Sequence, residues 1–201
     1  MFSFDLLQVV FWSITYVLIV VFGIIKRKTF MPIVAALFNI SWELNSLLSD
    51  FFCVRIPIVA LGHFVWIGLD FLIITIAIFY YVDNNKKMLL SFIFLPFIII
   101  GLYFIFKINY GQLYSSFIID LLVAICYLFV SFKEKDNIIE FIIIGITKLI
   151  GDFFAFIMYR QDTLVNIIGI IVFVINAIYL IILNNKPINK IKLTINKNEI
   201  F

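Results

Sequence analysis

The chain has 201 residues, of which 65% are hydrophobic and 13% charged, and its formal net charge is +3. Its mean hydropathy of +1.18 excludes an ordinary soluble domain, because a core built from a chain of this length cannot bury so much apolar surface. The composition therefore indicates an integral membrane protein, and the small positive charge gives no reason to expect a nucleic-acid partner.

Seven apolar stretches follow one another along the chain, each close to the roughly 20 residues that a helix needs to cross a bilayer. Short polar segments such as residues 26–28, 83–87 and 133–136 separate them. Continuous apolar runs such as residues 98–100 lack the alternation of a membrane barrel, so helices are predicted. The expected spans are 5–25, 31–52, 63–82, 89–106, 113–132, 138–159 and 164–184. The predicted fold is an all-α, seven-transmembrane-helix bundle forming one domain, residues 1–184, with a basic tail at 185–201.

The basic residues of the connecting segments fall mainly on one side of this predicted bundle. One side receives eleven of the fifteen Lys and Arg residues, and the other receives Arg55, Lys107 and Arg160, while Lys148 lies within a span. Because basic residues concentrate in cytoplasmic loops, an external N-terminus and a cytoplasmic C-terminus are predicted. We expect a multi-pass protein of the cell membrane, in contact with the lipid bilayer. The sequence leaves its oligomeric state open.

Four acidic residues lie inside apolar stretches: Glu43, Asp70, Asp120 and Asp152. A charge at the centre of a spanning helix costs about 2.5–3.5 kcal/mol on insertion scales, so each carboxyl should be neutralised, paired or retained for chemistry. With about 1.5 Å of rise per residue, all four are expected roughly 10–14 Å below the outer boundary. Four carboxyls at one level predict a common cavity in the outer half of the bundle.

Further polar and aromatic residues recur at helical spacing on the faces that carry these acids. Asn39, Trp42, Glu43 and Ser46 form one stripe, and Trp66 lies one turn before Asp70. Stretch 89–106 has no Asn, Gln or charged residue and is expected to be peripheral. The residues expected to bind a substrate are Asn39, Trp42, Trp66, Asp120, Tyr159, Asn176 and Tyr179.

Each of these features also has a purely structural interpretation. Polar side chains in membrane helices often only join neighbouring helices, and Lys148 with Asp152 one turn later is expected to form a structural ion pair. Small residues such as Gly145 and Gly151 are expected to permit close helix packing. His63, at the start of an expected span, is interpreted as an interfacial residue, with a proton relay as the less favoured role. No metal or cofactor site is expected, because the two cysteines and single histidine lack ligand spacing.

Glu43 is interpreted differently, because no residue on its own face offers an opposite charge. Loss of solvation in an apolar environment favours the protonated carboxyl, which is then a proton donor. Such an acid suits an apolar substrate that reacts once an alkene or epoxide is protonated. Tyr and Trp faces could stabilise the resulting carbocation by cation–π attraction.

The segment Asn39-Ile40-Ser41-Trp42-Glu43 resembles the Asn-x-x-Trp-Glu signature of the integral-membrane terpene cyclases. These small, seven-spanning enzymes occur in fungal meroterpenoid and indole-diterpene pathways and have bacterial relatives. Weaker likenesses lie at residues 64–69, 148–151 and 173–179. The resemblance implies an isomerase- or lyase-type enzyme in which Glu43 is the acid that starts cyclisation of a polyprenyl group, often an epoxide or a prenylated aromatic.

One position departs from the family pattern. In the fungal enzymes the last helix carries an Asp-x-x-Tyr pattern that supplies a second acid, whereas this chain has Asn176 followed by Tyr179. An amide cannot donate a proton as an acid does. Asp152 is the first candidate for the second acid, although its pairing with Lys148 would keep it ionised, and Asp70 is the next.

Two other classes of function remain open. A small proton-coupled or solute transporter of 3+1+3 type would use the same intramembrane carboxyls, with spans 1–3 and 5–7 as parallel repeats. A lipid-binding or assembly subunit would contain a satisfied polar core. A cyclase is expected to have a cavity open to lipid and closed at its base, and a carrier a midplane site reachable from both sides.

Overall fold

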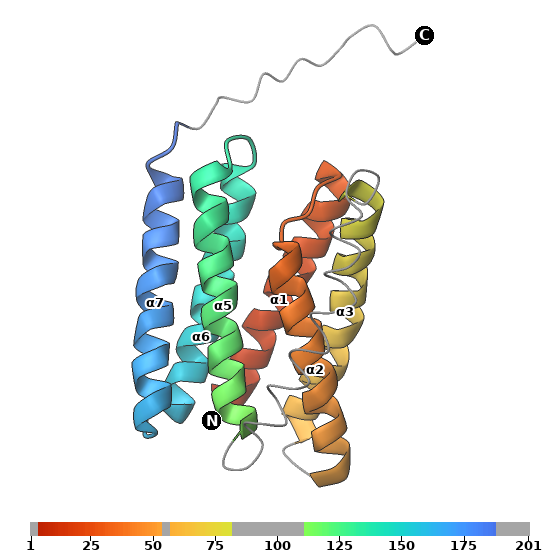
Figure 1. Cartoon of the computed structure of the whole chain (residues 1–201), viewed down its shortest axis with the longest axis vertical. Coiled ribbons are helices and arrows are strands. Elements are labelled where there is room, and N and C mark those ends of the chain that lie inside the picture. Colours follow the sequence, from red (N-terminus) through yellow and green to blue (C-terminus); the bar gives the residue numbers. More distant parts are fainter. Residues whose placement is uncertain (1–3, 54–56, 82–110, 188–201) are drawn as a thin grey trace, which may run out of the picture.

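The computed structural model describes residues 4–53, 57–81 and 111–187, and these ranges are almost entirely helical (Figure 1). They contain no strand, so the predicted all-helical class is confirmed for the described part of the chain. The expected span 89–106 and most of the tail 185–201 lie outside the described residues. The helices are α1 Phe4–Lys26, α2 Ile33–Cys53, α3 Pro57–Tyr81, α5 Gly111–Lys133, α6 Ile138–Tyr159 and α7 Thr163–Asn184.

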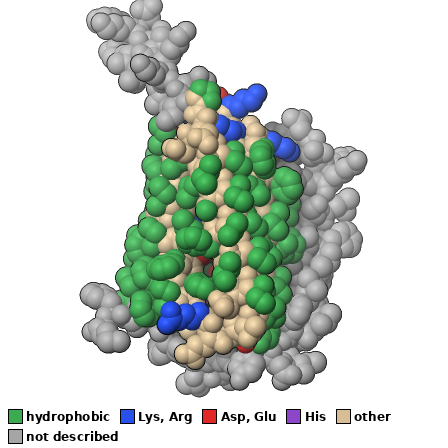
Figure 2. All heavy atoms as spheres, turned by 90° about the vertical axis from the view of Figure 1, so that its left-hand side faces the viewer, with side chains coloured by type: hydrophobic (Ala, Val, Ile, Leu, Met, Phe, Trp, Pro, Cys, Tyr) green, Lys and Arg blue, Asp and Glu red, His purple; other side chains and the backbone are tan. Residues whose placement is uncertain are grey.

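Five of these helices are long and apolar enough to cross a membrane, and α2 adds a shorter apolar stretch, Ile33–Leu44. Figure 2 shows apolar side chains along the length of one face of the bundle, with Lys and Arg side chains gathered toward its two ends. Apolar side chains can remain on this surface because lipid, unlike water, does not drive them inward. These features indicate a multi-pass membrane protein.

The predicted boundaries agree closely with the structure except at α3. This helix begins at Pro57 rather than at residue 63. Proline is favoured at the first helical position, where its missing N–H has no helical partner and its fixed φ suits the helix. The apolar stretch of α3 that could cross a membrane, Leu61–Tyr80, nevertheless agrees with the predicted span 63–82.

The six described helices form a closed ring in which each packs against two others. The order around the ring is α1, α3, α2, α5, α7, α6 and back to α1. Figure 1 shows the helices running side by side along the long axis of the molecule. Each triplet, α1–α3 or α5–α7, therefore has its third helix between its first and second, and the second helix of each triplet packs against the first helix of the other.

Glycines allow close packing between α6 and its neighbours, as predicted. A Cβ atom at Gly145 would overlap the ring of Tyr179 and lie 2.9 Å from Leu180 Cδ2. A Cβ atom at Gly151 would lie 2.8 Å from Trp12 Cδ1. The absence of a side chain at these two positions lets the aromatic rings of α7 and α1 lie directly on the α6 backbone.

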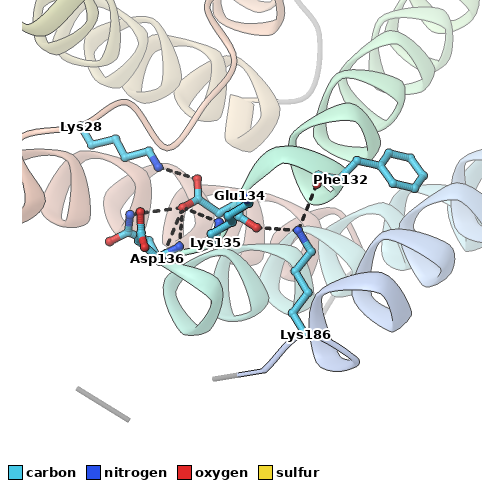
Figure 3. A network of polar contacts seen from close by, with 7 residues as sticks. Lys28, Phe132, Glu134, Lys135, Asp136 and Lys186 are labelled. Atoms are coloured by element: carbon cyan, nitrogen blue, oxygen red, sulfur yellow. Dashed lines mark hydrogen bonds and ion pairs between the residues drawn. The ribbon is translucent and has the colours of Figure 1, made fainter. Parts of the chain in front are cut away.

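We call the end of the bundle that carries the α1–α2 and α5–α6 connections and the C-terminus of α7 the lysine end. Here Glu134 forms an ion pair with Lys28, and its Oε1 accepts hydrogen bonds from the backbone N–H groups of Asp136 (3.1 Å) and Asn137 (3.2 Å) (Figure 3). Lys186 Nζ donates to the carbonyl oxygen of Glu134 at 2.5 Å. The Asn137 side chain does not cap α6, and the Glu134 carboxylate instead accepts hydrogen bonds from the N–H groups that precede this helix.

The charge of Glu134 depends on these contacts. Burial by itself raises the pKa of the Glu134 carboxyl, but the Lys28 ammonium and the two backbone N–H donors lower it further than burial raises it. The net effect is a pKa below the usual value, so Glu134 stays ionised. Its contacts with Lys28 and Lys186 connect the segment after α1, the α5–α6 connection and the end of α7. Lys26 and Glu140, 2.9 Å apart, form a second ion pair between α1 and α6.

Candidate functional site

The four acids within the helices belong to two polar networks, one formed by α1, α2 and α3 and the other by α5, α6 and α7. We call the first the Glu43 network; its members are Tyr16, Asn39, Glu43, His63 and Asp70. We call the second the Lys148 network; its members are Asp120, Lys148, Asp152 and Asn176. Together they contain all four acids on which the functional prediction rests.

Glu43 and His63 form the closest pair of the first network. Oε2 of Glu43, near the middle of α2, lies 2.5 Å from Nδ1 of His63 on α3. The two residues are only 3% and 2% exposed. A hydrogen bond between these atoms needs one proton, so either the His63 Nδ1–H donates to the Glu43 carboxyl group or the Glu43 O–H donates to the imidazole. In both states the pair is a proton donor held in an apolar environment.

Two tryptophan rings enclose the imidazole of His63. The ring centroid of Trp42 lies 5.1 Å from that of His63, and the centroid of Trp66 lies 5.4 Å from it on an almost perpendicular plane. Indole N–H groups fix both rings: Trp42 Nε1 donates to Ser115 Oγ on α5, and Trp66 Nε1 donates to Ser13 Oγ on α1, each at 3.0 Å. Four helices therefore position the Glu43–His63 pair and its aromatic surroundings.

Asn39 bonds a second acid of this network. Its Nδ2 donates to Oδ2 of Asp70 at 3.0 Å and also to the hydroxyl of Tyr16. Asp70 is fully buried, and its Oδ1 has no hydrogen-bond partner among the described residues. Glu43 is close enough to interact electrostatically with both Asp70 and Tyr16. The motif residues Asn39, Trp42 and Glu43 thus all contribute side chains to one buried assembly.

The second network is centred on a lysine within the bundle. Lys148 Nζ donates to Oδ1 of Asp120 and to Oδ2 of Asp152, both at 2.6 Å. Asn176 Nδ2 on α7 donates to the same Asp152 oxygen at 2.8 Å. The indole ring of Trp12 lies on the fourth side, with its centroid 5.2 Å from Lys148 Nζ, a cation–π contact. The expected Lys148–Asp152 ion pair is confirmed, and Asp120 joins it.

Helix α1 separates the two networks and connects them through aromatic rings. The centroids of Trp12, which faces Lys148, and Tyr16, which bonds Asn39, lie 6.0 Å apart. The four acids were expected to face a common cavity from a single depth. Direct contacts group them into two networks, with Glu43 and Asp70 in one and Asp120 and Asp152 in the other.

One prediction about α3 is wrong. His63 was expected at the membrane interface, but it is buried beside Glu43. Asp70, expected roughly 10–14 Å below the outer boundary, lies about 20 Å along the helix from Pro57, at about 1.5 Å per residue. The burial of His63 follows from the packing of α3 against α2. A proline followed by five apolar residues was the signal that could have placed the helix start correctly.

The remaining predicted residues lie apart from these networks. Tyr159, at the end of α6, packs edge-on against Phe117 with their ring centroids 6.3 Å apart. Tyr179 donates its hydroxyl hydrogen bond to the carbonyl oxygen of Phe141 at 2.6 Å. Sequence reasoning missed Trp12, Ser13 and Ser115, whose roles depend on contacts between helices distant in sequence.

No metal site is evident in the described part of the chain, where no group of three His, Cys, Asp or Glu side chains could hold an ion. Comparisons with protein-family models, with curated proteins and with solved structures found no match to this chain. The functional assignment therefore rests on the geometry of the two networks and on the sequence motif in α2.

Proposed function

We propose that this chain is a membrane-embedded acid catalyst of the terpene cyclase type, with Glu43 as the proton donor and an apolar prenyl or terpenoid compound as its substrate. The observation that carries the proposal is the buried Glu43–His63 pair between Trp42 and Trp66. It combines the two requirements of the reaction, a proton donor and aromatic faces that stabilise a cation without acting as nucleophiles.

The reaction starts when the neutral Glu43 carboxyl gives its proton to an alkene or epoxide. For an alkene, the O–H bond of the acid breaks, a C–H bond forms at one carbon, and the other carbon becomes cationic. For an epoxide, the proton goes to oxygen and a C–O bond breaks. Ring closure follows, and loss of a proton from the cyclised cation to the Glu43 carboxylate restores the acid. The product is an isomer of the substrate, so no cofactor is consumed.

In this proposal His63 is a positioning residue. A neutral imidazole that donates its Nδ1–H to Oε2 holds the carboxyl in one orientation and stabilises the carboxylate after proton transfer. Asp70 is the second acid, ahead of Asp152. Asp70 lies in the same network as Glu43, whereas Lys148 and Asn176 both bind Asp152 on the other side of α1.

The proposal includes seven spans in the cell membrane, with the N-terminus outside. The six described helices and the apolar stretch 89–106 make up this number, and the lysine end then faces the cytoplasm. Single-cysteine labelling in intact cells, in a background without Cys53 and Cys126, tests the orientation. A cysteine at Gln161 is expected to react with an impermeant reagent, and one at Lys135 only after lysis. The reverse pattern would refute the orientation.

The catalytic proposal is tested with membranes that contain the full chain. They are incubated with prenylated phenols, linear polyprenyl alcohols and the terminal epoxides of both, and products of unchanged mass are resolved by chromatography and mass spectrometry. The parent and Glu140→Gln, a control with the same change in a lysine-end ion pair, are expected to form an isomer that Glu43→Gln does not form. A well-inserted Glu43→Gln protein with undiminished activity would refute the role of Glu43.

One observation supports a second candidate, a carrier. The ring order α1, α3, α2, α5, α7, α6 consists of two triplets with the same internal arrangement, as in transporters built from parallel repeats. Fold alone does not establish function, so this candidate ranks second. Proton movement driven by a solute gradient in proteoliposomes would support it. If the panel above yields no isomer, such proton uptake would move the carrier to first place.

A further inference from the structure

The Lys148 network contains more acidic groups than basic groups. One ammonium group, on Lys148, lies 2.6 Å from each of two carboxyl groups, on Asp120 and Asp152. The other side chains around Asp152, Asn176 from α7 and Trp12 from α1, are uncharged. With both carboxyls ionised the network would carry one uncompensated negative charge in the middle of a membrane bundle. Such a charge is too costly to remain without a compensating ligand.

The hydrogen bonds of Asp152 indicate where a ligand is missing. Its side chain is 6% exposed, and Oδ2 accepts from both Lys148 and Asn176. Its other oxygen, Oδ1, has no partner among the described residues although it is completely buried. A buried carboxylate oxygen ordinarily accepts hydrogen bonds, and an unmade one costs about 1–3 kcal/mol or more. The unpaired Oδ1 is a second observation, independent of the charge count, that the network lacks one hydrogen-bonding group.

We propose that the Lys148 network is a proton-binding site, in which Asp120 and Asp152 share one exchangeable proton. A proton makes the network neutral and adds no volume to a tightly packed region. It is favoured over a metal cation because the Lys148 ammonium already occupies the position between the two carboxyls. The site is separate from Glu43, and it exists whether the chain is a cyclase or a carrier.

The proton can reach the site through Asp120. Its side chain is 18% exposed, whereas those of Lys148 and Asp152 are buried. We infer that protons enter and leave at Asp120, and that Asp152, which binds Lys148 and Asn176, is the inner member of the pair.

The charges of the Lys148 network predict how each substitution changes the number of protons that the network binds. Removing either carboxyl leaves one ammonium and one carboxylate, a neutral pair that needs no proton. Asp120→Asn and Asp152→Asn should therefore each abolish the bound proton. Lys148→Met should have the opposite effect, because two carboxyls without a cation both become protonated.

The test is infrared difference spectroscopy of the purified full chain in lipid nanodiscs during a pH titration. Protonated carboxyls are counted from the area of their C=O band. In the parent, one aspartic acid band should belong to the Lys148 network, and it should be missing in both Asn variants and doubled in Lys148→Met. Glu43→Gln and Asp70→Asn serve as controls, since the carboxyls that they remove lie in the other network.

Labelling of the aspartate carboxyl carbons with ¹³C gives a measurement on the unmutated protein, should a variant fail to fold. The parent and Asp70→Asn should then both show one shifted aspartic acid band from the Lys148 network. Lack of that band, or its persistence in both Asp120→Asn and Asp152→Asn, would overturn the proposal. A band that appears only when Na⁺ and K⁺ are removed would also overturn it, because a metal cation would then be the compensating charge.

Discussion

Glu43 on α2 and His63 on α3 place Oε2 and Nδ1 2.5 Å apart, with Trp42 and Trp66 on two sides of the imidazole. The two residues lie on different helices, so this contact depends on the packing of α2 against α3. In a bilayer this arrangement supplies a carboxyl that can hold and release a proton without exposure to water. Several consequences can be measured.

Replacing His63 should impair chemistry more than binding. His63→Gln keeps a side-chain N–H donor but loses the aromatic contacts and the second basic site. We expect kcat to fall by about 10²-fold, the lower end of general acid–base effects, with little change in KM. The measurement is isomer formation against substrate concentration. Equal kcat values for His63→Gln and the parent would contradict the positioning role, and Glu140→Gln again serves as the control.

Replacing Lys148 should destabilise the bundle. Lys148→Met removes the cation from two buried carboxyls, which must then take up protons and lose their ion pairs. Removing one partner of a buried ion pair costs about 3–5 kcal/mol. Thermal unfolding in detergent should show a large decrease in Tm. The triple variant Lys148→Met/Asp120→Asn/Asp152→Asn removes the charges together and should recover most of the loss. A single variant as stable as the parent would show that the network carries no charge.

The stability of the lysine end should depend on pH through Glu134. Its pKa lies below the usual value of 4.5, so the unfolded chain binds the Glu134 proton more readily than the folded protein does. The stabilisation is complete above the unfolded pKa and is lost as the pH falls through the lowered, folded pKa.

Tm measured by intrinsic fluorescence should therefore decrease in this acidic range for the parent. Glu134→Gln should have a lower Tm at neutral pH and a shallower decrease on acidification. Glu140→Gln, which removes the neighbouring ion pair, provides the matched control. A Glu134→Gln profile parallel to that of the parent at all pH values would contradict the assignment.

Packing against α6 should make Gly145 intolerant of a methyl group. The added Cβ would overlap the Tyr179 ring, and such overpacking costs about 1–3 kcal/mol. Gly68 on α3 gives a matched control, because a Cβ there would meet nothing within 4 Å. Gly145→Ala should therefore lower Tm, while Gly68→Ala should not. A similar Tm for both variants would show that α7 can move away from α6.

Much of the candidate site could be found from sequence because it depends on local pattern. The lengths of the apolar stretches located the six described helices, and the charges within spans identified Glu43, Asp70, Asp120 and Asp152. The i, i+4 spacing of Lys148 and Asp152 predicted their ion pair, since residues one turn apart lie on the same helix face. The sequence could not reveal His63 as the partner of Glu43, because that contact depends on where α3 starts and on how it packs.

The sequence by itself determined that this chain enters a membrane as helices and that it carries carboxyls within them. Backbone hydrogen bonding in lipid leaves a helix as the only structure for such apolar runs, so no tertiary information was needed. Only the tertiary structure decided which acids share a network. Association of helices in lipid depends on close packing and on polar contacts between chain segments far apart in sequence, and these set the ring order that divides the four acids across α1.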